Sequence, residues 1–222
     1  MNTEKRDFDK EAASWDENPV RVKLANDIIH AISEQIVLTP EMDIMDFGCG
    51  TGLLALKLQP LVCSVTGVDS SQGMLDIFNA KIAKLKLNKV NTVLVDLDKG
   101  DVLTGNYDLV LSNMTLHHIK DIEPLFAQFY EVTAPDGYLC IADLDLDDGQ
   151  FHSPPIAEDN TGVFHFGFDR PTLHKVFTEA GFDDVRSMTA AEVVKPSIDG
   201  EMRRFSVFLM IGRKIRLSRS NT

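Results

Sequence analysis

Short apolar runs alternate along this chain with stretches in which apolar residues recur every three or four positions. A short apolar run is typical of a buried strand, and the three-to-four spacing is typical of a helix that packs one face on a core. The runs predict strands at residues 43–47, 64–69, 90–96, 107–113 and 137–145. The spacing predicts helices at residues 50–58, 71–85 and 121–133. This alternation indicates βαβ units around a parallel sheet.

Both ends of the chain add elements to this sheet. Asn18 followed by Pro19 is a helix start signal, because asparagine caps helices well and proline suits the first helical position. Near the other end, a helical pattern at residues 170–182 precedes two β-rich runs, 184–194 and 203–212. The short connection between these runs indicates an antiparallel hairpin at one sheet edge.

The predicted fold is therefore a single α/β domain over residues 1–222. We expect a Rossmann-like, doubly wound, seven-stranded and mostly parallel sheet, with helices on both faces and an antiparallel C-terminal hairpin. Residues 1–38 form a predicted N-terminal helical cap. Residues 144–169 carry acids, glycines and two adjacent prolines without clear periodicity. A stretch of this length inside a compact domain is typical of a functional lid, here at the acceptor site, and we name it the lid segment.

Composition narrows the class of partner. The chain has 34 acidic side chains against 22 Lys plus Arg, a formal net charge of −12. This balance disfavours nucleic acid and anionic membranes, because both are bound mainly through basic surfaces. One cationic cluster occurs near the C-terminus: Arg213, Lys214, Arg216 and Arg219. The three cysteines, Cys49, Cys63 and Cys140, lack metal-ligand spacing, and no signal peptide or membrane span is apparent. We expect a reduced cytoplasmic protein without a metal, whose oligomeric state stays open.

A glycine-rich turn raises the question of a ligand. In "IMDFGCGTGLLAL", Gly48, Gly50 and Gly52 follow the first predicted strand and open a helix. Asp69 ends the next strand, 19 positions after Gly50, where a carboxylate can accept both hydroxyls of a ribose. The alternative is that the glycines only tighten a corner. Together with Asp69, they favour a nucleoside-bearing cofactor.

The spacing of the glycines argues against a dinucleotide. The dinucleotide fingerprint would place its third glycine at position 53, which is Leu53 here. Asp46, two residues before Gly48, would repel a pyrophosphate but attract an α-ammonium and tolerate a sulfonium. The phosphate-binding P-loop is also absent from the sequence. The pattern thus favours a nucleoside that carries an amino-acid arm.

Together, these residues resemble the motifs of one known family. "MDFGCGTGLLAL" resembles motif I of the class I S-adenosylmethionine-dependent methyltransferases, and "VTGVDSSQGMLDIFNAK", "VLVDLDKG" and "YDLVLSNMTLHHIKDIEPLF" resemble their second, third and fourth motifs. "APDGYLCIAD" and "FTEAGFDDV" are similar to later signatures of the family. The resemblance covers residues 8–214 and is closest to the small-molecule branch, of the ubiquinone- and menaquinone-biosynthesis type. It implies a methyltransferase that moves the methyl group of S-adenosyl-L-methionine to a small-molecule acceptor.

The resemblance also implies a set of cofactor contacts. They come from the N-terminal segment, the glycine turn and the ends of three further strands: Trp15, Asp46, Gly48, Cys49, Gly50, Thr51, Asp69, Ser70, Met74, Asp96, Leu97, Ser112 and Asn113. Asp46 would lie near the methionine ammonium and Asp69 at the ribose. Asp96 would meet the adenine edge, with Asp98 as a rival. Core packing is the alternative role for Met74.

Methyl transfer from a sulfonium is an in-line displacement, so alignment and exclusion of water are the main tasks of the protein, with a base where the nucleophile carries a proton. Candidate catalytic residues are His118, His165 and Asp143. The resemblance favours His118 over its neighbour His117, and His152 of the lid segment is a further candidate. The alternative for His118 is a structural hydrogen bond without a proton role.

Other functions remain open at this point. An NAD(P)-dependent oxidoreductase on a similar sheet is disfavoured by the glycine spacing, by Asp46 and by the lack of a Tyr-x-x-x-Lys pair. A protein that binds S-adenosylmethionine without transferring its methyl group, or a transferase with an aminopropyl donor, would share most of the motifs. Whether the acceptor atom is O, N, C or S is also open.

Overall fold

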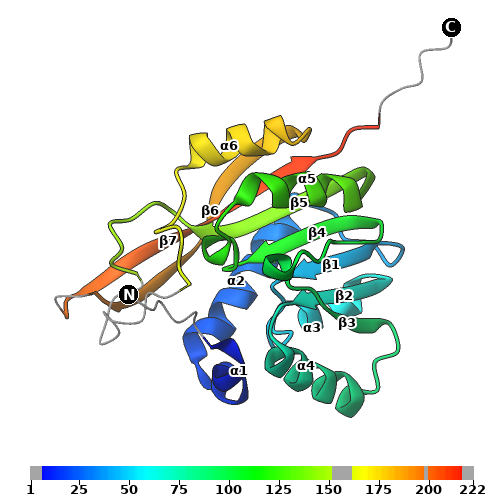
Figure 1. Ribbon diagram of the computed structural model, residues 1–222, viewed down its shortest axis with the longest axis horizontal. Coiled ribbons are helices and arrows are strands. Elements are labelled where there is room, and N and C mark those ends of the chain that lie inside the picture. Colours follow the sequence, from blue (N-terminus) through cyan, green and yellow to red (C-terminus); the bar gives the residue numbers. More distant parts are fainter. Residues whose placement is uncertain (1–6, 152–161, 198–199, 217–222) are drawn as a thin grey trace, which may run out of the picture.

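A computed structural model describes residues 7–151, 162–197 and 200–216 (Figure 1). Within them, seven strands form one sheet in the order β3-β2-β1-β4-β5-β7-β6, and β7 runs antiparallel to both of its neighbours. The strands are β1 (Asp43–Phe47), β2 (Ser64–Asp69), β3 (Val90–Leu94), β4 (Tyr107–Asn113), β5 (Thr133–Leu144), β6 (Asp183–Pro196) and β7 (Met202–Arg213). The predicted fold class is confirmed. His152, residues 152–161 of the lid segment and Arg219 lie outside the described residues.

Helices flank the sheet on both faces (Figure 1). The α-helices are α1 (Phe8–Glu11), α2 (Pro19–Gln35), α3 (Ala55–Leu58), α4 (Gln72–Leu85), α5 (Ile122–Val132) and α6 (Arg170–Glu179). Short 3₁₀ turns are η1 (Ala12–Glu17), η2 (Gln59–Leu61), η3 (Leu97–Lys99) and η4 (Leu116–His118). The predicted start of α2 is confirmed, because the Asn18 side chain accepts a hydrogen bond from the Val20 amide and Pro19 takes the first helical position.

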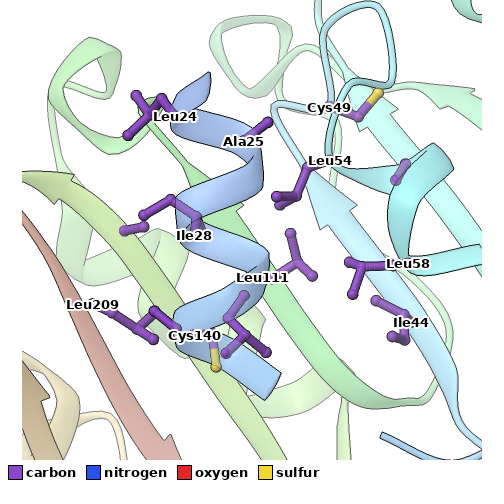
Figure 2. Close-up of a cluster of buried hydrophobic side chains, with 14 of the residues drawn as sticks. Leu24, Ala25, Ile28, Ile44, Cys49, Leu54, Leu58, Leu111, Cys140 and Leu209 are labelled. Atoms are coloured by element: carbon purple, nitrogen blue, oxygen red, sulfur yellow. The ribbon is translucent and has the colours of Figure 1, made fainter. Parts of the chain in front are cut away.

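The core has two layers, one on each face of the sheet. Successive side chains of a strand point to opposite faces, so β1 places Ile44 in one layer and Met45 in the other. Figure 2 shows the first layer, with Leu24, Ala25 and Ile28 of α2 above Ile44, Leu111, Cys140 and Leu209 of the strands. In the second layer, α5 and α6 meet through the rings of Phe126 and Phe177, whose centroids are 5.0 Å apart. The central strands of the sheet are thus packed on both faces.

The crossover helix after β1 is shorter than predicted. Residues 51–54 form turns, and regular α-helix covers only Ala55–Leu58 before η2. The reason is local, since Gly52 has a φ of +81°, which no residue of a right-handed helix adopts. β5 in turn begins at Thr133, four residues earlier than predicted, through an irregular pairing with Tyr107 of β4.

The topology places a switch point at the carboxyl ends of β1 and β4. These strands are neighbours in the sheet, yet β1 continues through β2 on its other side, so the strand order reverses between them. Ligands of open α/β sheets bind at such switch points. None of the described helices combines the length and the apolar character needed to cross a membrane.

Candidate active site

The glycine turn between β1 and α3 has one open position. A Cβ added to Gly48 would lie 2.1 Å from Thr115 Oγ1, and one added to Gly52 would lie 2.3 Å from the Phe78 ring. These two glycines are therefore required by close packing. A Cβ on Gly50 would meet nothing nearer than 3.9 Å. Gly50, with a φ of +53°, thus presents bare backbone to the space that a ligand would occupy.

Asp69 ties the end of β2 to this open position. Its Oδ2 accepts a hydrogen bond from the Gly50 amide at 2.8 Å, and its Oδ1 accepts one from the Ser71 amide at 2.9 Å. Burial raises the pKa of Asp69, while these backbone hydrogen bonds partly offset the effect. Ser70, beside it, has an exposed side chain. The predicted ribose acceptor therefore lies directly against the glycine turn.

Three buried oxygens at the ends of β1 and β4 lack hydrogen-bond partners among the described residues: Asp46 Oδ2, Ser112 Oγ and Asn113 Oδ1. The two strands are paired in register, with Phe47 opposite Ser112, so these oxygens belong to adjacent strand ends. Buried polar atoms are almost always satisfied in folded proteins. Three exceptions at two adjacent strand ends indicate that a polar ligand completes the site.

The chemistry of these atoms fits the amino-acid arm of S-adenosylmethionine. The carboxylate of Asp46 and the amide oxygen of Asn113 are acceptors, as an ammonium group requires, and the Ser112 hydroxyl can donate to a carboxylate. Burial, together with the charge of Asp69, raises the pKa of Asp46 to about 7, although the Ala55 amide donates a hydrogen bond to it. A cation beside Asp46 would relieve this electrostatic cost.

The expected adenine side is built from α4 and the end of β3. Met74 is buried in the core, yet its sulfur lies 3.9 Å from the position of a Cβ on Gly50. Its core role is confirmed, and its contact with the adenine stays a prediction. Asp96 is half-buried directly after β3 and caps η3 by accepting a hydrogen bond from the Asp98 amide, whereas the Asp98 side chain is exposed. Burial favours Asp96 over Asp98, and Leu97 packs on the second core layer.

The side chains of two expected cofactor residues, Cys49 and Thr51, support the glycine turn. The Cys49 amide donates to the Val68 carbonyl at 3.0 Å, and its side chain lies in the first core layer, where burial raises the pKa of the thiol. The Thr51 hydroxyl is buried and donates to Asp16 Oδ1 at 2.5 Å. Both side chains thus face protein groups, and the expected cofactor contact through the backbone of this turn stays a prediction.

His118 has the geometry of a proton acceptor. Its Nδ1 lies 2.6 Å from the Gly162 carbonyl oxygen, so Nδ1 carries the proton and Nε2 of the neutral ring has a lone pair. The ring is half-buried and stacks edge-on against Phe8 of the N-terminal segment, with 5.2 Å between ring centroids. It ends η4, in the loop that follows β4.

Asp143 is not available as a base. It is completely buried, and its carboxylate binds the ring Nδ1 of His117 at 2.7 Å and the His117 amide at 3.3 Å. Burial alone would raise the pKa of Asp143, but the charge and hydrogen bond of His117, with backbone hydrogen bonds, lower it overall. The expectation of a catalytic Asp143 therefore does not fit, and the residue holds His117 in place.

His165 lies apart from the predicted cofactor residues. Its Nε2 donates to the Ile119 carbonyl at 2.9 Å, and its ring stacks on Phe168. It lines a cavity between the first turns of α5 and α6, and none of the predicted cofactor residues lines that cavity. The expectation that His165 serves as a base beside His118 thus finds no support in this arrangement.

Sequence reasoning missed the residues that connect these parts. The Phe164 amide donates to the His117 carbonyl at 2.9 Å, which fixes the end of the lid segment to the loop after β4. Asp9 and Asp16 of the N-terminal segment bind α4 and the glycine turn. All of these contacts join residues far apart in the chain, and no spacing rule would have revealed them.

Comparison with known proteins agrees with this geometry. A family model described as a methyltransferase domain matches residues 18–187. An uncharacterised methyltransferase of Schizosaccharomyces pombe is 34% identical over 166 residues, which cover 69% of this chain and 55% of the relative. The chain thus spans about half the length of that relative.

Two further likenesses cover more of the chain. The malonyl-[acyl-carrier protein] O-methyltransferase of a Methylovorus species is 24% identical over 202 residues, 82% of this chain and 68% of the relative. The structure of Haemonchus contortus phosphoethanolamine N-methyltransferase 2 in complex with S-adenosyl-L-methionine matches with a TM-score of 0.69 over 86% of this chain and 53% of that one. At 18% sequence identity, this likeness shows a shared fold.

Proposed function

Since the chain belongs to the methyltransferase domain family, whose methyl donor is S-adenosylmethionine, we propose that it transfers that methyl group to a small-molecule acceptor. One observation carries the proposal: the buried oxygens of Asp46, Ser112 and Asn113, unpartnered among the described residues, belong to the adjacent ends of β1 and β4, at the switch point of the sheet. Acceptors for an ammonium beside a hydroxyl donor for a carboxylate match an amino-acid arm. The pyrophosphate of a dinucleotide would meet the Asp46 carboxylate instead.

The remaining cofactor residues follow from this placement. Asp69 receives the ribose hydroxyls, and Gly50 allows close approach of the backbone. Trp15 of the N-terminal segment and Met74 of α4 both lie beside Gly50. When bound, S-adenosylmethionine supplies an activated methyl group on a sulfonium with a good leaving thioether. Asp96 with Leu97 stays the predicted contact for the adenine edge.

The role that we propose for His118 is to accept a proton from the acceptor molecule. The Gly162 carbonyl holds its Nδ1 and so leaves Nε2 as the basic atom, in the way that a fixed partner orients catalytic histidines elsewhere. A histidine that only braced the loop would make the same hydrogen bond, so turnover of a His118 variant is what separates the two roles. An acceptor whose reacting atom carries no proton would make the base dispensable.

Charge and likeness support a small acceptor. The net charge of −12 disfavours a polyanionic substrate. The names of two similar proteins give a malonyl group on a carrier protein and phosphoethanolamine as their acceptors. For this chain we propose a compact acceptor that enters between the loop after β4 and the lid segment. The resemblance of this chain to methyltransferases of the ubiquinone- and menaquinone-biosynthesis type stays a prediction.

Calorimetry and turnover test this function separately. Titration of the purified protein with S-adenosylmethionine, S-adenosylhomocysteine and NADH should show binding of the first two alone. Incubation with S-adenosylmethionine and a panel of small hydroxyl, amine, thiol and carboxyl compounds should release S-adenosylhomocysteine with at least one of them. Binding without turnover on any acceptor would favour a non-catalytic binding protein, and binding of NADH alone would overturn the proposal.

A further inference from the structure

The N-terminal arm, residues 7–17, contacts three walls of the cofactor site. Asp9 accepts a hydrogen bond from the Gly73 amide at 2.8 Å at the start of α4. Phe8 stacks on His118 in the loop after β4. Asp16 binds the glycine turn. The arm therefore bridges the elements that follow β1, β2 and β4, which lie at the same edge of the sheet (Figure 1).

Asp16, Thr51 and Lys81 form a closed triangle of contacts, which we name the clasp. Asp16 accepts a hydrogen bond from the Thr51 hydroxyl and pairs with the Lys81 ammonium. Lys81 also donates to the Thr51 carbonyl oxygen at 2.7 Å. The side chains of Lys81 and Asp16 are only 24% and 36% exposed. A partly buried network of this kind is stronger than an isolated surface ion pair, because each member satisfies two others.

The clasp holds the arm over the open side of the glycine turn. Trp15, next to Asp16, places its indole Nε1 3.9 Å from the position of a Cβ on Gly50, and the Arg21 guanidinium stacks 3.6 Å from the centre of the Trp15 ring. A ligand that contacts the Gly50 backbone thus has Trp15 as a neighbour. Its departure on that side requires Trp15, and with it the arm, to move away.

We propose that Asp16 and Lys81 are positioning residues that retain the cofactor. Neither needs to touch it: Asp16 belongs to the arm, Lys81 to α4, and both act through Thr51 and Trp15. The clasp keeps the arm closed and the glycine turn in its binding shape, so it sets how fast S-adenosylmethionine and its demethylated product leave. This inference goes beyond methyl transfer and rests only on cofactor binding.

Release kinetics test the clasp directly, because Trp15 is the single tryptophan of the chain and reports on the arm by its fluorescence. Stopped-flow chase of bound S-adenosylhomocysteine should show release about tenfold faster in Lys81→Met and in Asp16→Asn than in the wild type, the effect expected for loss of a partly buried charged hydrogen bond. Lys81→Arg should restore most of the wild-type rate. Lys84→Met is the matched control, since Lys84 is an exposed lysine on the same helix.

Salt provides a readout that a purely structural role would not produce. Wild-type release should accelerate from low to high ionic strength as the ion pair is screened, and the Lys81→Met rate should not change. Equal release from Lys81→Met, Asp16→Asn and Lys84→Met would overturn the clasp while cofactor binding by the wild type stands. A wild type that binds no S-adenosylhomocysteine would overturn both the clasp and the proposed function.

Discussion

At the scale of single residues, Asp46 shows a conflict between binding and stability. Its pKa is raised to about 7, first by burial and then by the charge of Asp69. A carboxyl group that holds its proton more tightly in the folded state stabilises the fold fully below its unfolded pKa of 3.8, and this contribution is lost as the pH rises through about 7. The unliganded protein therefore carries a buried charge above that pH.

Asp46→Asn should for this reason stabilise the unliganded protein. The gain in the free energy of unfolding is at most about 4 kcal/mol at pH 8 and is smaller at pH 5, because the cost accumulates from the unfolded pKa of 3.8 up to the folded pKa of about 7, where the unfolded chain is ionised and the folded Asp46 keeps its proton. Urea unfolding of wild type and variant at both pH values measures the difference. A variant less stable than the wild type at pH 8 would show that Asp46 has a partner that compensates its charge.

The raised pKa of Asp46 also predicts how the affinity for the cofactor depends on pH. Only the ionised Asp46 attracts an ammonium, so the affinity for S-adenosylmethionine should rise about tenfold from pH 6 to pH 8, as the raised pKa is crossed. Calorimetry across this range measures it. In Asp46→Asn the affinity should be lower and nearly independent of pH. An equal slope in the variant would assign the titration to another group, with Asp69 the nearest candidate.

Substitution of His118 should separate proton transfer from cofactor binding. His118→Gln removes a basic Nε2 and should lower kcat by about 100-fold or more, while the affinity for S-adenosylhomocysteine changes little, since His118 is not among the cofactor contacts. Single-turnover kinetics and calorimetry on the same samples compare the two effects. Loss of binding and turnover in equal measure would mean that His118 only shapes the loop.

At the scale of elements, the strands could be predicted from the sequence and several contacts could not. The runs that became β1, β2 and β4 have buried apolar centres because both faces of an inner parallel strand are covered, whereas the edge strand β3 is mostly exposed. The helix after Gly52 was predicted too long, since helical spacing does not reveal a positive φ. Asp143 resembled an accessible acid at a strand end, and only the structure shows His117 covering it.

Some residues of the candidate site could likewise be predicted from the sequence, and others could not. Asp46, Gly50 and Asp69 were predictable because each stands at a fixed offset from a strand end, and topology brings those ends together. The side chains of Cys49 and Thr51 have the same offsets but face the protein. The clasp joins residues 35 and 30 positions apart, through two side chains in one contact and through a side chain and a backbone carbonyl in the other. Such contacts depend on how the N-terminal arm docks, which no local pattern encodes.

At the scale of the whole molecule, the predicted cofactor contacts come from several elements at once, the ends of β1, β2 and β4 and the N-terminal arm. Binding should therefore add to the stability of the entire fold. At 100 times its dissociation constant, a ligand adds about 2.7 kcal/mol. For a chain of this size, we expect S-adenosylhomocysteine to raise Tm by roughly 5–10 °C in a thermal scan.

The Asp46→Asn variant tests whether this shift in Tm arises at the predicted cofactor site. Asp46→Asn should melt higher than the wild type without ligand and gain less from S-adenosylhomocysteine, because the buried charge that destabilises the empty site is the charge that binds the ammonium. NADH at the same concentration should leave Tm unchanged, since the Asp46 corner repels a pyrophosphate. A larger shift with NADH than with S-adenosylhomocysteine would place a dinucleotide at the switch point and remove the physical basis for methyl transfer.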